Sequence, residues 1–273
     1  MAQISADLKR TLTSSFFYKN EHVAIVDGKD AWLGDAPLSW GRCSNFLSLP
    51  GLRGFWPMSS FDEGGNAYDL SGQGRTLTYN GNPTYNYVGL APYIDLDGTG
   101  DFLSRADEAG LDISGTESYV AAAAQGLTMG GWFYFNNLDP NRSLINKWDA
   151  ATNQRAYLFQ TNTDWRFAVS NNGVASKWLM TGVTPAAATW YFSVARFIPS
   201  TEVAIFVNMT KYADVTAIPA SLFNSNVGLG VGGSAAGGGL WPGRISFCFL
   251  CATALSDTMI GALFQQTRNL FGV

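Results

Sequence analysis

From residue 51 onward, short apolar runs alternate with turn signals at intervals of about ten residues, a pattern typical of an all-β sandwich or barrel. The run "EVAIFVNM" alternates by residue, so positions 203, 205 and 207 are predicted to face one way, and positions 204, 206 and 208 the other. The predicted strands cover residues 51–58, 76–80, 93–98, 101–106, 127–137, 142–149, 156–162, 165–171, 178–182, 189–198, 202–212, 227–233 and 243–255.

Two segments show helical rather than alternating spacing. In residues 4–18, apolar side chains recur every fourth position, which predicts an amphipathic helix with one apolar stripe: Ile4, Leu8, Leu12 and Phe16. The stripe either packs on its own domain or contacts a capsid or a neighbouring subunit. The second helix is predicted within residues 255–271, with Ser256 as its N-cap and Ile260, Leu263 and Phe264 on one face.

Residues 19–50 are irregular and crowded with Gly, Asp and Pro, as in an extended connector. The chain therefore divides into residues 1–50, an arm for anchoring or oligomerisation, and residues 51–273, a β-sandwich. "GGSAAGGG", residues 232–239, is expected to be a loop between two strands.

Composition removes several classes of function. The 273 residues are 47% hydrophobic and 14% charged, so a large core is expected, and the net charge of −4 makes nucleic acid a poor partner. No apolar run approaches the roughly 20 residues of a membrane-spanning helix. The first residues lack the pattern of a signal peptide. Three cysteines favour a reducing place of synthesis over a disulfide framework.

Five motifs in sequence order resemble the laminin-G-like, concanavalin A-like jelly-roll family, over residues 51–271. The resemblance implies a concanavalin A-like jelly-roll β-sandwich preceded by the arm and closed by the short C-terminal helix. The motifs are "DLSGQG" (69–74), "LDGTGDFL" (96–103), "LTMGGWFYF" (127–135), "WYFSVARFIPSTEVAIFVNMTKY" (190–212) and "GRISFCFLCATALS" (243–256).

The first motif is a loop that, in many relatives, carries a calcium ion. The resemblance places Asp69, Asp62 and Gly72 at this site, because carboxylate and carbonyl oxygens are the ligands that calcium takes. Ser246 stands where the family often has a second acid, which lowers the expected affinity. A plain Gly-rich turn is the alternative. A phosphate-binding loop is excluded, because the following "RTLTYN" has β character rather than starting a helix.

Candidate catalytic groups are sparse. His22 is the only histidine and has no nucleophile motif beside it, while Cys248 and Cys251 lie on a predicted strand that turns them to opposite faces as buried thiols. Asp95 and Asp97 share a face, as a glycosidase pair would, but Asp97 matches the family's structural turn. The sequence therefore predicts a protein that is not an enzyme.

Aromatic side chains near strand ends suggest sugar binding by stacking, with polar residues alongside. The candidate residues for a glycan are Trp165, Trp178, Asp164 and Asn171. The alternative is that these tryptophans fill the core, as expected of Trp132 and Trp190.

These observations lead by analogy to a non-enzymatic bacteriophage virion protein, a capsid decoration or fibre component. It would be made in the host cytoplasm and exposed on the particle, where it contacts other virion proteins and host glycans. Homo-oligomers are expected, a trimer being one natural arrangement. The alternatives are a free carbohydrate-binding lectin and, third, a glycan-cleaving enzyme.

Overall fold

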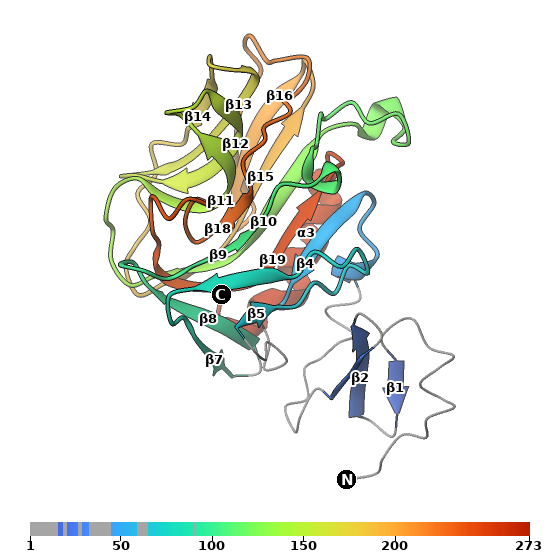
Figure 1. Cartoon of the computed structure of the whole chain (residues 1–273), viewed down its shortest axis with the longest axis vertical. Coiled ribbons are helices and arrows are strands. Elements are labelled where there is room, and N and C mark those ends of the chain that lie inside the picture. Colours follow the sequence, from blue (N-terminus) through green and yellow to red (C-terminus); the bar gives the residue numbers. More distant parts are fainter. Residues whose placement is uncertain (1–15, 19–20, 27–28, 33–44, 59–64, 90) are drawn as a thin grey trace.

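The computed structural model describes residues 16–18, 21–26, 29–32, 45–58, 65–89 and 91–273. Two eight-stranded sheets pack face to face, which confirms the predicted concanavalin A-like β-sandwich (Figure 1). One sheet has the order β17-β16-β15-β10-β19-β8-β7, with β4 also paired to β19, and the other has the order β14-β13-β12-β11-β18-β9-β6-β5. All the strand pairs are antiparallel, as expected of a jelly roll.

The strands of the sandwich follow the predicted segments closely. They are β4 (Leu52–Trp56), β5 (Asn66–Ala67), β6 (Leu77–Asn80), β7 (Thr84–Val88), β8 (Ala91–Asp97), β9 (Phe102–Arg105), β10 (Leu127–Phe135), β11 (Arg142–Asp149), β12 (Gln154–Thr161), β13 (Trp165–Gly173), β14 (Lys177–Met180), β15 (Trp190–Ile198), β16 (Glu202–Val207), β17 (Thr210–Asp214), β18 (Leu229–Val231) and β19 (Pro242–Cys251).

The main core lies between the two sheets. Because strand side chains alternate, each central strand gives every second residue to this core. Val203, Ile205 and Val207 of β16 belong to it, whereas Ala204 and Phe206 face the opposite side, as the alternation predicted. The largest side chains of this core are Trp56, Trp165, Trp241 and Tyr157.

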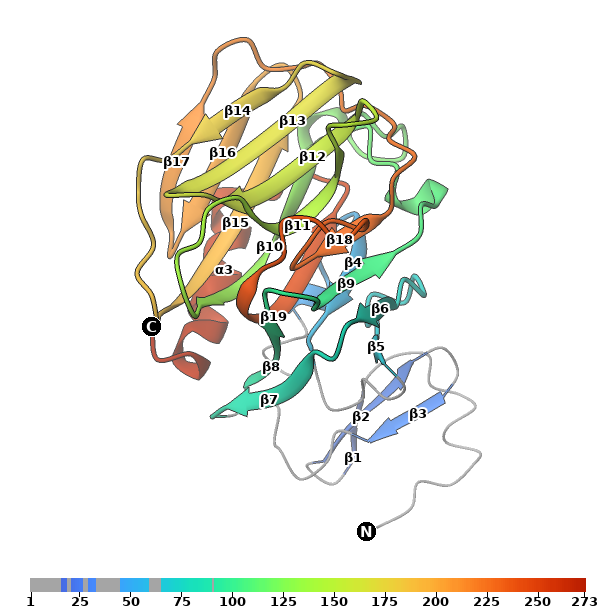
Figure 2. The ribbon, with the colours of Figure 1, turned by 60° about the vertical axis from the view of Figure 1, so that its left-hand side comes forward.

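A second apolar cluster lies on the outer face of the β10–β19 sheet, under helix α3 (Asp257–Thr267). The α3 helix lies on the side of this sheet away from β11–β14 (Figure 2). Ser256 caps it as predicted, because its side chain accepts a hydrogen bond from the Met259 amide. Trp132 and Trp190 are buried as expected, but in this outer cluster rather than between the sheets.

Two structural predictions need correction, and one strand is additional to those predicted. Residues 202–212 form a hairpin, β16 and β17, instead of one strand. The additional strand is β7, the "TYNYV" edge strand. Phe16 lies in β1 (Phe16–Tyr18) rather than in a helix, while Ile4, Leu8 and Leu12 lie outside the described residues.

The described part of the leading segment also contains β2 (Glu21–Val26) and β3 (Lys29–Trp32). Strands β1, β2 and β3 form a three-stranded sheet whose pairings join only these three strands. His22 belongs to β2, in register with Phe17.

Candidate functional site

A surface pocket of about 390 Å³ opens beside β7 and the end of β8. Its walls come from the β6–β7 loop, the β8–β9 turn and the residue that follows β10, so three separate segments of the chain meet there. Most of its side chains form hydrogen bonds rather than apolar contacts. The lining residues are Gly81, Asn82, Thr84, Asp95, Leu96, Asp97, Gly100, Asp101 and Asn136.

Strand register places Asp95 in the floor of the pocket. Asp95 of β8 lies opposite Thr84 of β7 on one side and Arg244 of β19 on the other. Its Oδ2 atom accepts a hydrogen bond from Arg244 Nε at 3.1 Å, and the carboxamide of Asn136 lies 3.4 Å from its Oδ1 atom. Asp95 therefore presents an oriented carboxylate to the pocket.

Arg244 is held by more than this ion pair. Its guanidinium carbon lies 4.9 Å from the ring centre of Tyr93 and 4.6 Å from that of Tyr134, which are cation–π distances. These two rings pack against the outer apolar cluster, which extends to Trp190. Packing thus fixes the guanidinium that orients Asp95.

The β8–β9 turn forms a second wall and is built around Asp97. Its Oδ1 atom accepts hydrogen bonds from the amides of Thr99, Gly100 and Asp101 at 2.7, 3.0 and 3.2 Å. Its Oδ2 atom accepts one from the Thr99 hydroxyl at 2.6 Å, and this bond does most to lower the pKa of Asp97, to about 2. The interpretation of Asp97 as a structural turn residue is confirmed.

Asp101 joins this turn to the β6–β7 loop. Its carboxylate accepts hydrogen bonds from the amide of Asn82 at 2.8 Å and from the amide of Asp97 at 3.2 Å. A Cβ atom at Gly81 would lie only 2.3 Å from Asp101 Oδ1, and Gly81 has φ +76°. Glycine is therefore needed where the two loops approach, which gives the pocket a fixed wall.

The arrangement suits binding of a hydroxyl-rich ligand. Carboxylate and carboxamide oxygens accept hydrogen bonds from hydroxyl groups, and the side-chain NH2 groups of Asn82 and Asn136 donate them. The two asparagines and Thr84 have exposed side chains, so a ligand reaches them directly.

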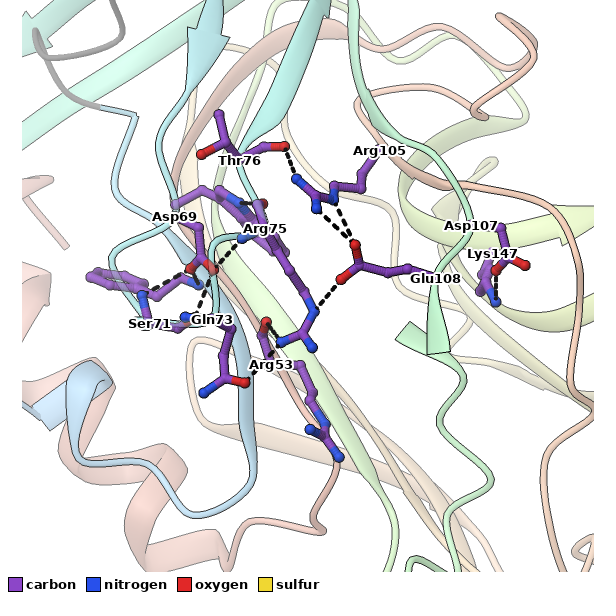
Figure 3. A network of polar contacts seen from close by, with 12 residues as sticks. Arg53, Asp69, Ser71, Gln73, Arg75, Thr76, Arg105, Asp107, Glu108 and Lys147 are labelled. Carbon is purple, nitrogen blue, oxygen red and sulfur yellow. Dashed lines mark hydrogen bonds and ion pairs between the residues drawn. The ribbon is translucent and has the colours of Figure 1, made fainter. Parts of the chain in front are cut away.

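The opening loop at Asp69 is occupied by the protein's own donors (Figure 3). Asp69 Oδ1 accepts hydrogen bonds from the amides of Phe55 and Ser71 at 3.0 and 2.8 Å. Its Oδ2 atom accepts them from the Ser71 hydroxyl and the Arg75 amide at 2.7 and 2.8 Å. Only 2% of Asp69 is exposed. Four donors use the lone-pair directions that a cation would need, so the geometry favours the turn alternative.

Of the other two proposed calcium ligands, the structure describes only Gly72. Gly72 is exposed and has φ +78°, which suits a turn, and Asp62 lies outside the described residues. Ser246 is buried and donates a hydrogen bond to the Pro92 carbonyl. Within the described ranges, no group of three or more His, Cys, Asp or Glu side chains is placed to hold a metal ion.

An ion-pair network continues from this loop (Figure 3). Arg75 Nε donates to Glu108 Oε1 at 2.6 Å, and Arg105 donates to Glu108 Oε2 at 2.7 Å. Burial alone would raise the pKa of Glu108, but hydrogen bonds from Arg105 and Arg75 hold it below its usual value. Nearby, the buried Lys147 ammonium pairs with Asp107 at 2.6 Å. These contacts tie the β9–β10 connection to β9, β11 and the β5–β6 loop, so their role is structural.

The predicted glycan residues do not form one group. Trp165 is fully buried between the sheets, so it has no face for a sugar, and this prediction is corrected. Asp164 is 6% exposed and accepts hydrogen bonds from Arg166 Nε and the Gly182 amide. Trp178 is partly exposed on β14 and Asn171 is exposed on β13, so these two remain available at the surface.

The cysteine prediction is confirmed for the described residues. Cys248 belongs to the core between the sheets and Cys251 to the outer cluster, both fully buried. Burial raises the pKa of each thiol, which keeps it protonated and unreactive. Cys43 lies outside the described residues.

Sequence reasoning missed Asn82, Thr84 and Asn136 as pocket residues. Thr84 lies in a short segment, "GNPTYNYVG", with turn residues on both sides, which gives a weak strand signal. The Gly-Asn-Pro signal before β7 and the Asn-Asn pair after β10 mark the two loops that carry the asparagines. Their meeting depends on β8 pairing with both β7 and β19, which no local signal encodes.

Comparison with known proteins adds a family assignment. A family model described as "Concanavalin A-like lectin/glucanases superfamily", of the laminin-G type, matches residues 106–261, more than half of the chain. The chain belongs to the concanavalin A-like lectin/glucanase superfamily. The resemblance noted in the five motifs is therefore confirmed for the family. A comparison with curated proteins finds no match.

Solved structures of this superfamily's fold include toxin binding domains. The chain is similar to the binding domain of Paraclostridial Mosquitocidal Protein 1 (TM-score 0.60, 12% identity, covering 80% of this chain and 53% of that one). It is also similar to the receptor binding domain of botulinum neurotoxin C/D mosaic serotype (TM-score 0.57, 11% identity, covering 79% of this chain and 51% of that one). A third similar structure is the binding domain of botulinum neurotoxin serotype G (TM-score 0.59, 11% identity, covering 78% of this chain and 50% of that one). The chain thus spans about half of each, and the likeness shows the fold alone.

Among the described residues, no helix has the length and apolar character needed to cross a membrane.

Proposed function

We propose that this lectin-like domain is a non-catalytic module that binds carbohydrate in the pocket beside β7 and β8. The observation that carries the proposal is the pocket itself: about 390 Å³, open, and lined by the oriented carboxylate of Asp95 with the exposed side chains of Asn82, Thr84 and Asn136. Lectin-like folds use such donors and acceptors to bind sugar hydroxyls. The toxin domains that share the fold are named as binding domains, and a recognition role fits that comparison.

The same side chains argue against glycoside hydrolysis. That reaction needs one carboxyl group that is protonated near neutral pH and a second that is ionised. Asp97 has a pKa of about 2 because Thr99 and three amides hydrogen-bond to its carboxylate, so it is not the acid. Asp101 is committed to backbone amides, and Asp95 to Arg244. These contacts support the proposal that the pocket binds its ligand without cleaving it.

The binding proposal is tested by a double variant, N82A/N136A, on a glycan array. Both side chains are exposed, so the fold is expected to persist while pocket hydrogen bonds are lost. We expect at least about a fivefold weaker signal for the glycans that the natural chain retains, since two hydrogen bonds at roughly 0.5–1.5 kcal/mol each are removed.

The matched control is N137A, an exposed asparagine in the same loop that does not line the pocket. It should bind as the natural chain does. Equal retention of glycans by N82A/N136A and N137A would show that the pocket is not the site. Hydrolysis of any array glycan by the natural chain would contradict the non-catalytic role.

We further propose that the module is carried on a bacteriophage particle, as a capsid decoration or fibre component, with residues 1–50 as its attachment segment. The apolar recurrence through Ile4, Leu8 and Leu12 supports an attachment stripe, and β1–β3 pair only among themselves in the described chain. Contacts with other virion proteins and a homo-oligomer, such as a trimer, belong to this proposal. Co-sedimentation of the chain with particles, lost when residues 1–50 are deleted, is the expected result; a free soluble lectin would not sediment.

A further inference from the structure

A pair of tryptophans lies on the outer face of the other sheet, far along the strand order from the pocket. Trp148 is the penultimate residue of β11, and Trp178 lies in β14, the edge strand. Their ring centres are 6.0 Å apart with an angle of 69° between the planes, an edge-to-face contact. Both side chains are partly exposed.

The two strands that carry these rings are not neighbours, because β12 and β13 lie between them. At a strand spacing of about 4.8 Å, the backbones of β11 and β14 are roughly 14 Å apart. The indoles therefore lean toward each other across the two intervening strands. Trp178 lies opposite Ala168, which lies opposite Leu158, so these two apolar residues share the outward face with Trp178.

Leu158 and Ala168 are 6% and 0% exposed, yet they belong to neither core cluster. Other side chains therefore cover them, and Trp178, which lies opposite Ala168, is placed to contribute. The edge-to-face contact between the indoles restrains both rings before any ligand arrives, which lowers the entropy cost of binding.

Polar groups surround the indole pair. The Arg155 guanidinium lies 6.0 Å from the ring centre of Trp148 and donates hydrogen bonds to the carbonyls of Val174 and, at 3.2 Å, Ala150. Arg155 lies opposite Trp148 where the β11–β12 register shifts, so the irregular pairing brings them together on the surface. The neighbouring carboxamides of Asn171 and Asn172 are exposed.

We propose that Trp148 and Trp178 form a second carbohydrate site, which takes the apolar face of a neutral pyranose ring, with Arg155 and Asn171 at its polar edge. This inference extends the proposed glycan binding but rests on separate residues. A sugar ring combines an apolar face with a rim of hydroxyl groups, which matches indoles edged by donors and acceptors. A protein partner would instead need a wide apolar interface, and the polar edge limits the apolar area.

The two sites lie on different sheets, near opposite ends of their strand orders. One short oligosaccharide therefore does not reach both, whereas a polysaccharide, or several glycans on one surface, engages both at once. Two weak sites then give an apparent affinity above either alone.

The test uses the full chain with cellohexaose, mannohexaose and laminarihexaose as probes, followed by tryptophan fluorescence and titration calorimetry. In the N82A/N136A background, where the pocket is disabled, at least one probe is expected to change the fluorescence. Adding W178A is expected to weaken that binding at least about tenfold, and W178F should restore much of it because a phenyl ring still stacks. M180A, a change at a 58%-exposed neighbour on the same strand, is the matched control and should bind normally.

The outcomes separate the two sites. If N82A/N136A binds none of the three probes, the inference of an indole site is overturned, while the proposal of a glycan-binding pocket stands. Binding lost with W178A but unchanged in N82A/N136A would support the indole site and contradict the pocket. Equal loss in W178A and M180A would also overturn the stacking site, because a general apolar contact explains it. If W178A is unstable, W178F replaces it in the comparison with M180A, provided that its CD spectrum and urea midpoint match those of the natural chain.

Discussion

Replacing Asp69 by alanine is expected to lower the free energy of unfolding by about 3–5 kcal/mol, because it leaves buried donors without partners. Asp69 is 2% exposed and accepts four hydrogen bonds within one loop. The amide of Phe55, in the centre of β4, is enclosed by protein and has no water to replace the lost carboxylate. Urea denaturation of both proteins measures this difference in the free energy of unfolding, provided that its dependence on urea concentration is the same for both.

Ser71→Ala is the matched control for this loop. It removes one of the four bonds and leaves the carboxylate in place, so a loss of only about 0.5–1.5 kcal/mol is expected. Repeating both measurements with calcium and with chelator separates the turn from a metal site. The geometry predicts the same values in both conditions. Stabilisation of the natural chain by calcium, abolished in Asp69→Ala, would show instead that the loop binds the ion.

Replacing Trp132 by alanine is expected to cost a further large amount, about 3–5 kcal/mol, as for other buried tryptophans. Its ring stacks on Phe271 at 4.2 Å and on Phe264 at 6.0 Å, and its Nε1 atom donates to Thr267 Oγ1 at 2.9 Å. Trp132 therefore links β10 to helix α3 and the last residues. Loss of amide-exchange protection in α3 should accompany the lower urea midpoint.

Met259→Ala provides the comparison within the same helix. Met259 is 42% exposed on α3, and alanine favours helix, so a change within about 0.5 kcal/mol is expected. If Trp132→Ala unfolds at the same urea concentration as Met259→Ala, the outer cluster does not anchor the helix. That result would contradict the packing described for this face of the sheet.

The strands could be predicted because alternation and turn residues are local signals. Residues 142–149 were predicted as the strand that the structure contains, and the Ser256 cap begins α3 as expected. The hairpin within 202–212 could not be predicted in this way. Its turn uses Asn208 and Met209 with φ +45° and +74°, and a methionine there gives no turn signal.

The candidate sites were harder to predict because they depend on pairing between distant segments. Trp165 and Trp178 looked alike near strand ends, but a difference in strand phase buries one and exposes the other. The partner of Trp178 comes from β11, with two strands between them, so its sequence neighbours do not reveal it. Asp69 matched a calcium motif, yet its donors lie on the preceding strand and along its own loop.

The central claim is that the pocket beside β7 and β8 recognises carbohydrate, and a crystal structure of the full chain with the strongest array glycan tests it most directly. The account predicts a sugar in that pocket, with hydroxyl groups within hydrogen-bond distance of Asp95 and Asn136. A sugar bound only elsewhere, with the pocket filled by solvent at saturating glycan, would contradict it.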